Sequence, residues 1–174
     1  MSTISKKICL IGDFGAGKTS LIRRFVDRQF SDKYLSTVGV KISRKSVEII
    51  NSQAGKNLIL QLLIWDIEGS TKFKGVSASY FQGAKGAIIV GDVTRPESLE
   101  NILEHIQAFT KVNPHGKTVI ALNKSDLIDA EYLEKYRQLY SFSDNKSFIS
   151  TYASSAKTGK NVDEIFQSLA NSMI

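Results

Sequence analysis

Cysteine, proline and long apolar runs are all scarce in this 174-residue sequence, and each scarcity excludes a class of protein. The single cysteine, Cys9, can form no disulfide within the chain, which argues against a disulfide-stapled secreted protein and suits a reducing cytoplasm. The longest nearly apolar run, residues 58–65, is far shorter than the roughly 20 residues that a membrane helix needs. The sequence also carries no lipid-attachment motif. We therefore expect a cytoplasmic protein without an intrinsic membrane anchor.

The remaining composition is that of a globular protein. Hydrophobic residues make up 42% and charged residues 23%, and only two prolines interrupt the chain, so we expect one domain over residues 1–174. The net charge of +6 lies in residues 1–50, which hold ten Lys/Arg and four Asp/Glu. No interleaving of aromatic and basic residues suggests stacked bases, and no appended basic or OB-like domain is visible, so we expect no binding of nucleic acid. We also expect a monomer.

Strand-like and helix-like segments alternate along the chain, which predicts an α/β fold with a mainly parallel sheet, helices on both faces and ligands at the carboxyl ends of the strands. A turn-like stretch between "VEII" and "NLILQLLIWD" predicts a hairpin. Residues 94–112 predict a helix that begins with a capping box at Thr94 and buries Leu99, Ile102, Leu103, Ile106 and Phe109.

A glycine-rich loop follows the first strand-like segment and precedes the first helix-like one. It reads "GDFGAGKT", and Gly12, Gly17, Lys18 and Thr19 satisfy the pattern G-x-x-x-x-G-K-[ST]. Glycines let the backbone curl so that its N–H groups face an anion, and the following helix adds the partial positive charge of its N-terminus. Lys18 supplies a charge for the terminal phosphates, and the Thr19 hydroxyl suits a magnesium ion. The loop therefore predicts a nucleotide-phosphate site.

The stretch "NKSD", residues 123–126, indicates which base is bound. A carboxylate such as Asp126 can accept hydrogen bonds from the N1–H and the exocyclic amine of guanine, whereas adenine offers no such pair of donors. A site built to pair with polar groups rejects an analogue that lacks them, by roughly 10⁴-fold in favourable cases. Alone this stretch is a weak signal, but its order and distance after the phosphate loop favour a GTP or GDP site.

Five motifs together resemble the Ras superfamily of small GTPases, and the Rab branch most of all. They are "GDFGAGKTS", "YLSTVGV", "IWDIEG" with "SYFQGAKGAIIVGDVT", "NKSD" and "SSAK", and the likeness runs from about residue 6 to the end. The resemblance implies a three-layer P-loop NTPase fold, with a mostly parallel six-stranded sheet that has one antiparallel edge strand. It also implies a guanine-nucleotide switch that uses Mg²⁺.

The resemblance assigns roles to individual residues. Nucleotide contacts are implied for Asp13, Phe14, Gly15, Ala16, Gly17, Lys18, Thr19, Ser20, Phe30, Tyr34, Thr37, Gly69, Asn123, Lys124, Asp126, Ser155, Ala156 and Lys157. Magnesium is implied at Thr19, Thr37 and Asp66, and catalytic roles at Lys18, Thr37, Gly69 and Ser70. Effectors and regulators are expected at residues 31–45 and 67–80, where the basic "KISRK" at 41–45 suits an acidic partner.

Three departures from the family pattern fall on hydrolysis. The sequence reads "DIEGS" where the family has Asp-Thr-Ala-Gly-Gln, so Ser70 replaces the glutamine that orients the attacking water. Glu68 replaces a small residue, and its carboxylate must be protonated, turned outward or paired. Phe14 stands where the family has a small residue, and its ring should obstruct an arginine from a partner. We expect slow intrinsic GTP hydrolysis.

Two rival interpretations stay open, and a third is disfavoured. The chain is either a slow switch or a GTP-holding interaction module with essentially no turnover. The alternative to impaired hydrolysis is that Phe14 packs against an apolar switch residue and Glu68 forms a salt bridge, while the water is positioned differently from the family pattern. A small-molecule kinase is disfavoured because no arginine-rich lid is visible. His105 and His115 lie near no motif, so we expect surface or helix-packing roles for both.

Overall fold

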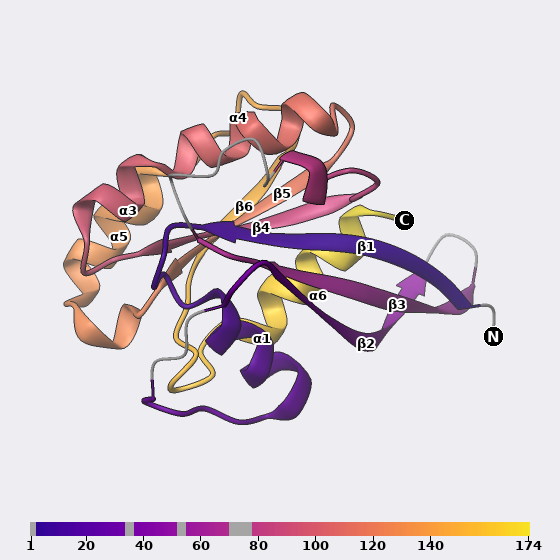
Figure 1. Cartoon of the computed structure of the whole chain (residues 1–174), viewed down its shortest axis with the longest axis horizontal. Coiled ribbons are helices and arrows are strands. Elements are labelled where there is room, and N and C mark those ends of the chain that lie inside the picture. The colour runs from indigo at the N-terminus through magenta and orange to yellow at the C-terminus, as the bar shows by residue number, and fades with distance from the viewer. Residues whose placement is uncertain (1–2, 34–36, 52–54, 70–77) are drawn as a thin grey trace.

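The protein consists of a six-stranded sheet with helices on both faces (Figure 1). The structure is a computed structural model, which describes residues 3–33, 37–51, 55–69 and 78–174. The strands lie in the order β2-β3-β1-β4-β5-β6, and only the β2–β3 pair is antiparallel. The elements are β1 (Thr3–Gly12), α1 (Lys18–Asp27), β2 (Val40–Asn51), β3 (Lys56–Ile67), β4 (Gly86–Asp92), α3 (Pro96–Glu100), α4 (Ile102–Val112), β5 (Lys117–Asn123), the 3-10 helix η2 (Ser125–Leu127), α5 (Ala130–Leu139), β6 (Phe148–Ala153) and α6 (Val162–Ser172). The predicted fold class is confirmed.

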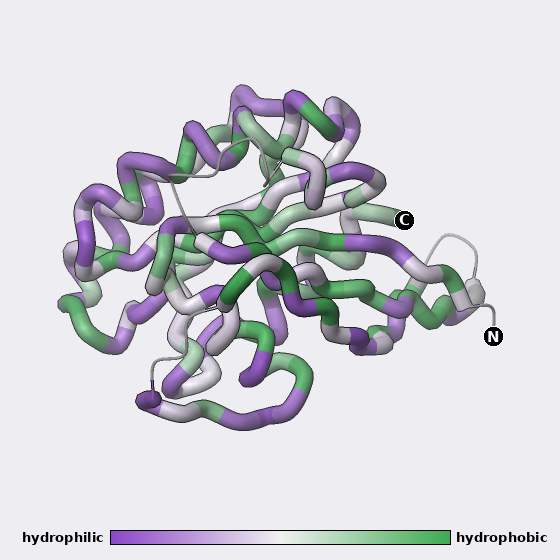
Figure 2. The backbone as a smooth tube through the Cα atoms, in the orientation of Figure 1, coloured by the Kyte–Doolittle hydropathy of each residue, from purple (hydrophilic) through white to green (hydrophobic). Residues whose placement is uncertain are grey.

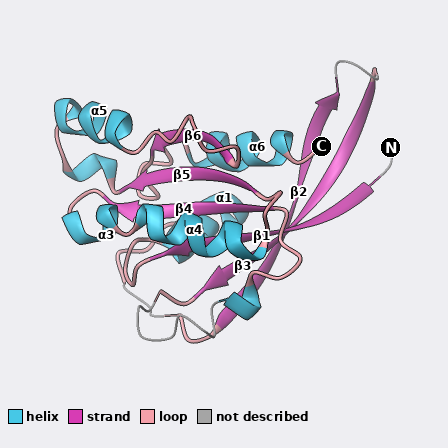
Figure 3. Ribbon diagram, turned by 90° about the horizontal axis from the view of Figure 1, so that it is seen from above, coloured by secondary structure: helices cyan, strands magenta, loops and turns pink. Residues whose placement is uncertain are grey.

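The helices divide between the two faces of the sheet. Helices α1 and α6 cover one face, and α3, α4 and α5 cover the other (Figures 1 and 3). Phe25 and Phe166 stack at 4.0 Å between ring centroids in the first core, and Phe81 meets Phe109 edge-on at 6.0 Å in the second. The central strands are apolar over most of their length because they are buried on both faces (Figure 2).

The sheet register brings several loop-bearing strand ends to one edge. Gly12 at the end of β1 pairs with Val90 of β4, and Asp92 at the end of β4 pairs with Asn123 of β5. Parallel strands that end together release their following loops at a common crevice, which is where open α/β sheets bind ligands. The phosphate loop and the "NKSD" loop therefore leave the same edge of the sheet.

Three local predictions were wrong. Thr94 does not cap a helix: its hydroxyl donates to Asp92 Oδ1 at 2.6 Å, and the helix begins at Pro96 with Arg95 as its N-cap. The predicted helix is also divided at Asn101 into α3 and α4. Leu103, expected in the core, is 42% exposed because it lies on the outer side of α4.

Two further expectations concern Cys9 and membrane spans. The Cys9 thiol is fully buried, and burial raises its pKa to about 12, which is typical of an unreactive structural thiol. Within the described ranges, none of the helices is long and apolar enough to cross a bilayer.

Candidate guanine-nucleotide site

A cavity of about 330 Å³ opens at the loop-bearing edge of the sheet, a size typical of small-ligand sites. Most residues predicted to hold nucleotide or magnesium line it, namely Phe14, Gly15, Gly17, Lys18, Thr19, Ser20, Phe30, Thr37, Gly69, Asn123, Lys124, Asp126, Ala156 and Lys157. Four others lie behind this lining and hydrogen-bond to it, namely Asp13, Ala16, Asp66 and Ser155. Tyr34 and Ser70 lie outside the described residues.

Each main-chain carbonyl of residues 12–16 accepts a hydrogen bond from a side-chain nitrogen. The bonds are Lys18 Nζ to Gly12 O (2.8 Å) and Asp13 O (3.1 Å), Arg95 Nη2 to Phe14 O (2.6 Å), Lys124 Nζ to Gly15 O (2.9 Å) and Asn123 Nδ2 to Ala16 O (3.0 Å). The protein's own donors thus occupy these carbonyl oxygens, which lowers their repulsion of an anion bound in the loop.

The geometry of the loop requires glycine at the start of helix α1. Gly17 has φ of 101°, a left-handed conformation that other residues rarely adopt, and a Cβ there would overlap the Asn123 amide. Helix α1 begins at Lys18 with no side-chain cap, so its first N–H groups stay available at the cavity. This end of α1 therefore suits a phosphate group.

Lys18 is the buried cation of the site. Its side chain is 6% exposed, and burial lowers the pKa of its ammonium to about 8, while the charges of Asp66 and Asp13 act in the opposite direction. A buried cation without a full counter-charge favours an anionic ligand, because a phosphate would supply that charge.

Thr19, Thr37 and Asp66 come together from three segments. Thr19 Oγ1 donates to Asp66 Oδ2 at 2.6 Å and lies 2.8 Å from Thr37 Oγ1. Asp66 Oδ1 is buried and has no hydrogen-bond partner among the described residues, and burial raises the pKa of its carboxyl. Within those residues no cluster of three or more His, Cys, Asp or Glu could hold a metal. The hard oxygen set with an orphaned carboxylate oxygen fits Mg²⁺, which prefers few protein ligands.

The base end of the cavity consists of two loops joined to each other. Ser125 N donates to Ser154 O at 2.9 Å, and Ser155 Oγ donates to Asp126 Oδ1 at 2.8 Å. This bond orients the Asp126 carboxylate, which keeps acceptor capacity for the guanine N1–H and amine. Arg24 Nε donates to Ala156 O at 2.7 Å and thereby ties the second loop to helix α1.

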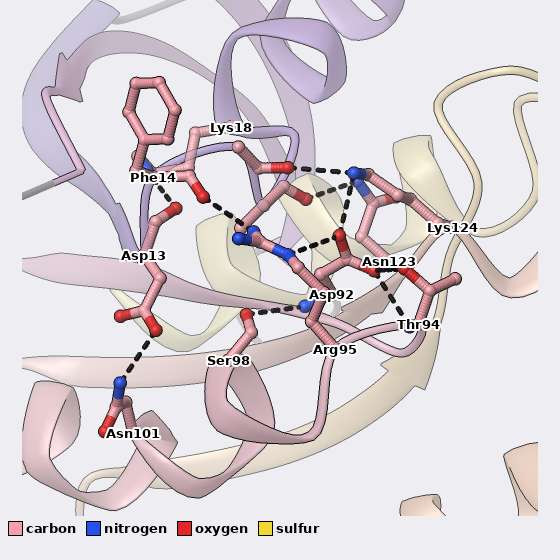
Figure 4. A network of polar contacts seen from close by, with 12 residues as sticks. Asp13, Phe14, Lys18, Asp92, Thr94, Arg95, Ser98, Asn101, Asn123 and Lys124 are labelled. Carbon is pink, nitrogen blue, oxygen red and sulfur yellow. Dashed lines mark hydrogen bonds and ion pairs between the residues drawn. The ribbon is translucent and has the colours of Figure 1, made fainter.

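A buried carboxylate that the sequence analysis missed connects the base and phosphate loops (Figure 4). Asp92 is 1% exposed, and its Oδ2 accepts from Lys124 Nζ at 2.8 Å and from Arg95 Nε at 3.1 Å. Burial alone would raise the Asp92 pKa, but hydrogen bonds from Lys124 and Thr94 outweigh it and lower the pKa. Asp92 therefore stays ionised and holds two donors that reach the phosphate loop.

Glu68 is turned away from the phosphate end of the cavity. Its Oε2 accepts from Gly39 N at 2.9 Å, and its own N–H donates to Gly39 O at 2.9 Å. Of the three alternatives predicted for this carboxylate, the structure therefore has it turned outward and hydrogen-bonded to the segment that carries Thr37. Phe14 lines the cavity but is 54% exposed.

His105 contradicts the expectation that it lies near no motif. Its Nε2 lies 2.7 Å from Asp13 Oδ1 in the phosphate loop, although 92 residues separate them. Sequence reasoning also missed five residues that line the cavity, namely Arg23, Ser31, Asp32, Lys33 and Leu127. Ser31, Asp32 and Lys33 directly follow Phe30, and Leu127 follows Asp126, so proximity to predicted residues was the only available signal.

Together these features are typical of a P-loop nucleotide-binding protein: a phosphate loop at a helix N-terminus, an oxygen set that fits Mg²⁺, and a hydrogen-bonded carboxylate, Asp126, in the cavity lining. The profile of the Ras family matches residues 7–174. The chain is 36% identical over 167 residues to the GTP-binding protein ypt1 of Schizosaccharomyces pombe, covering 94% of this chain and 77% of ypt1. It is 34% identical over 169 residues to the Ras-related protein Rab-13 of Canis lupus familiaris, covering 97% and 79%. The GTP-binding protein YPTM2 of Zea mays is 36% identical over 168 residues, covering 96% and 79%.

The chain belongs to the Ras family and is a Rab-like small GTPase. The predicted family is thus confirmed, and with it a GTP-binding molecular switch.

Proposed function

We propose that residues 1–174 form one G domain that binds GDP and GTP with Mg²⁺ and hydrolyses GTP slowly. The observation that carries the slow hydrolysis is the engagement of Glu68 with Gly39 N. Because this carboxylate is bound to the backbone, it does not replace the water-orienting glutamine for which Ser70 is substituted. No glutamine, glutamate or histidine is among the described residues that line the cavity. The described part of the cavity lining therefore offers no evident group to align the water.

The retained residues support nucleotide binding and sensing. Lys18 neutralises charge on the terminal phosphates, and Thr19, Thr37 and Asp66 would hold Mg²⁺, which neutralises phosphate charge when bound. Gly69 would donate its N–H to a γ-phosphate, as the family pattern implies. It lies so close to the phosphate loop that a Cβ at this position would meet Lys18 Nζ at 2.5 Å. A γ-phosphate contacted from Thr37 and Gly69 could order both segments that carry them.

The proposed partner surfaces are residues 31–45 and 67–80. In the first of these, Val38 is 88% exposed and Ile42 is 50% exposed, and the edge strand β2 carries exposed Lys41 and Arg44. An apolar surface with a basic border suits effectors or regulators of acidic character. We further propose that the protein acts as a cytoplasmic monomer that does not bind nucleic acid.

A single-turnover experiment tests this function. The nucleotide-free protein is loaded with GTP and Mg²⁺, and GDP formation is followed by chromatography beside the triple variant Phe14→Gly, Glu68→Ala, Ser70→Gln. We expect GTP to persist in the native chain and to be cleaved by the triple variant. Comparable cleavage by both proteins would show that another group aligns the water. Glu134→Ala is a matched control, because its carboxylate pairs with Arg137 at an exposed site of α5.

A GTP-holding interaction module with no turnover is the second candidate. The two hydrogen bonds between Glu68 and Gly39 favour this second candidate. They join the segment that carries Thr37 to the segment that carries Gly69 without any contribution from a nucleotide. The same experiment separates the candidates over a longer time. Slow conversion in the native chain supports a switch, whereas GTP that stays intact until it dissociates supports the module.

A further inference from the structure

The outer side of the phosphate loop is held by three side chains from residues 95–105. Asn101 Nδ2 donates to Asp13 Oδ2 at 2.7 Å, and His105 Nε2 lies 2.7 Å from Asp13 Oδ1. Arg95 Nη2 donates to the carbonyl of Phe14 at 2.6 Å. Figure 4 shows the Asn101 and Arg95 contacts reaching the loop from the helical side. We call Arg95, Asn101 and His105 the loop clasp.

We propose that the loop clasp positions the phosphate loop and thereby sets the rate at which guanine nucleotide is released, with His105 as its least expected positioning residue. This inference rests on the proposed nucleotide binding and adds a role for α3 and α4, which contribute no residue to the cavity lining. The clasp residues touch the loop and not the ligand, so they act through Asp13 and Phe14.

Asp13 connects helix α4 to the phosphate loop through hydrogen bonds of its side chain and its main chain. Its carboxylate has both oxygens engaged and its side chain is only 14% exposed, so the side chain cannot turn without breaking two short hydrogen bonds. The carbonyl of the same residue accepts from Lys18 Nζ and from Ala16 N, each at 3.1 Å. A movement of Asp13 therefore alters both the buried cation and the turn of the loop.

Helix α4 is a rigid support for this contact. Ile102, Ile106 and Phe109 are fully buried on the side of α4 that faces the sheet, which fixes the helix in the core. Asn101 and His105 lie one helical turn apart, and His105 N donates to Asn101 O at 3.0 Å. The two donors are thus presented to the two oxygens of one carboxylate from consecutive turns.

Release of a fluorescent GDP analogue in Mg²⁺ tests the clasp. We expect His105→Phe to accelerate release about tenfold, because it removes one charge-assisted hydrogen bond that holds Asp13. His105→Gln keeps a donor of similar reach and should recover most of the native rate. His115→Phe is the matched control, because His115 is the other histidine of the chain and is exposed. An unchanged rate in His105→Phe, or equal rates in His105→Phe and His105→Gln, would overturn the proposal.

A second readout needs no nucleotide. Urea unfolding of the nucleotide-free native chain, Asp13→Ala, His105→Phe and the double variant forms a double-mutant cycle. We expect the cost of the His105 substitution to fall strongly when Asp13 is already alanine, whereas additive costs would contradict the contact. Native protein that fails to retain GDP would overturn the proposed function instead, and the unfolding cycle would still decide whether the clasp exists.

Discussion

The nucleotide cavity has two ends that are built differently. The base end carries Asp126, and the other end, which we call the switch end, carries Thr37 and Gly69. At the base end, Asp92, Asn123 and Ser155 are almost fully buried, and their hydrogen bonds connect three strand ends. At the switch end, Glu68 and Thr37 are only half-buried and come from loops beside the edge of the sheet. The residues proposed to recognise the base thus lie in the more buried part of the site, whereas two of the departures from the family pattern, Phe14 and Glu68, lie in its more exposed part.

The largest effect on nucleotide affinity is expected from a substitution at the base end. Asp126→Ala removes the only carboxylate positioned by Ser155 for the guanine N1–H and amine, so GDP affinity should fall about 10³-fold and preference over ADP should collapse. Competition titrations with GDP and ADP measure both quantities. Leu127→Ala is the control, because Leu127 lines the cavity without a polar group. Retained guanine preference in Asp126→Ala would contradict the assigned base site.

A smaller effect should separate GTP from GDP at the switch end. A Cβ at Gly69 would lie 2.5 Å from Lys18 Nζ and from Phe14 N, so Gly69→Ala must push its segment away from the phosphates. We expect GTP affinity to fall about tenfold or more, since one hydrogen bond to a charged group is lost, with GDP affinity much less changed. Equal losses for the two nucleotides would show that Gly69 does not sense a γ-phosphate.

The pH dependence of GDP affinity tests the role of the buried Lys18 ammonium at the phosphate loop. Burial lowers the pKa of free Lys18 to about 8, and a bound phosphate favours the ammonium, so binding takes up a proton above that pH. GDP affinity should therefore fall about tenfold between pH 8 and pH 9.5, as measured by fluorescence titration. Between pH 8 and pH 9 the unfolded chain keeps a proton on Lys18 that the folded chain has lost, so the nucleotide-free protein should become more stable as pH rises. Above pH 9 the raised pKa of Cys9 acts in the opposite direction, because the folded chain then keeps a thiol proton that the unfolded chain loses. A Lys18→Arg variant should lose both trends, because arginine stays charged.

The smallest expected effect concerns Glu68 alone. Glu68→Ala removes one hydrogen bond to Gly39 N, so the free energy of unfolding should fall by about 1 kcal/mol or less. GTP cleavage should stay slow, because Ser70 and Phe14 are unchanged. A large gain in cleavage from this single substitution would locate the block at Glu68 and would contradict an account that needs all three departures.

The fold and the binding motifs could be predicted because their signals are local. The phosphate loop and "NKSD" are consecutive residues whose roles follow from their own chemistry, and the alternation of strand and helix patterns determines the sheet. The hairpin was predicted too, but β2 begins at Val40, well before the predicted "VEII". The added residues alternate between polar and apolar less regularly, because β2 is an edge strand with exposed Ile42.

The contacts that support the site could not be predicted in the same way. Arg95, Asn101 and His105 reach the phosphate loop from 81 to 92 residues away, and nothing in their own neighbourhood marks them as partners of Asp13 or Phe14. Asp92 was missed because an aspartate after a buried strand is ambiguous until the register places it beside Lys124. Thr94 was misassigned because its hydroxyl bonds to Asp92, an interaction that competes with capping.

One loading experiment tests the central claim that guanine-nucleotide binding is retained while hydrolysis is slow. Nucleotide-free native protein is incubated with equimolar GTP and ATP in Mg²⁺, separated from free nucleotide, and its bound nucleotide is identified by chromatography at successive times. We predict that only guanine nucleotide is retained and that GTP persists long after a rapid GTPase would have converted it to GDP. Retained ATP, or complete conversion to GDP at the first time point, would contradict the claim.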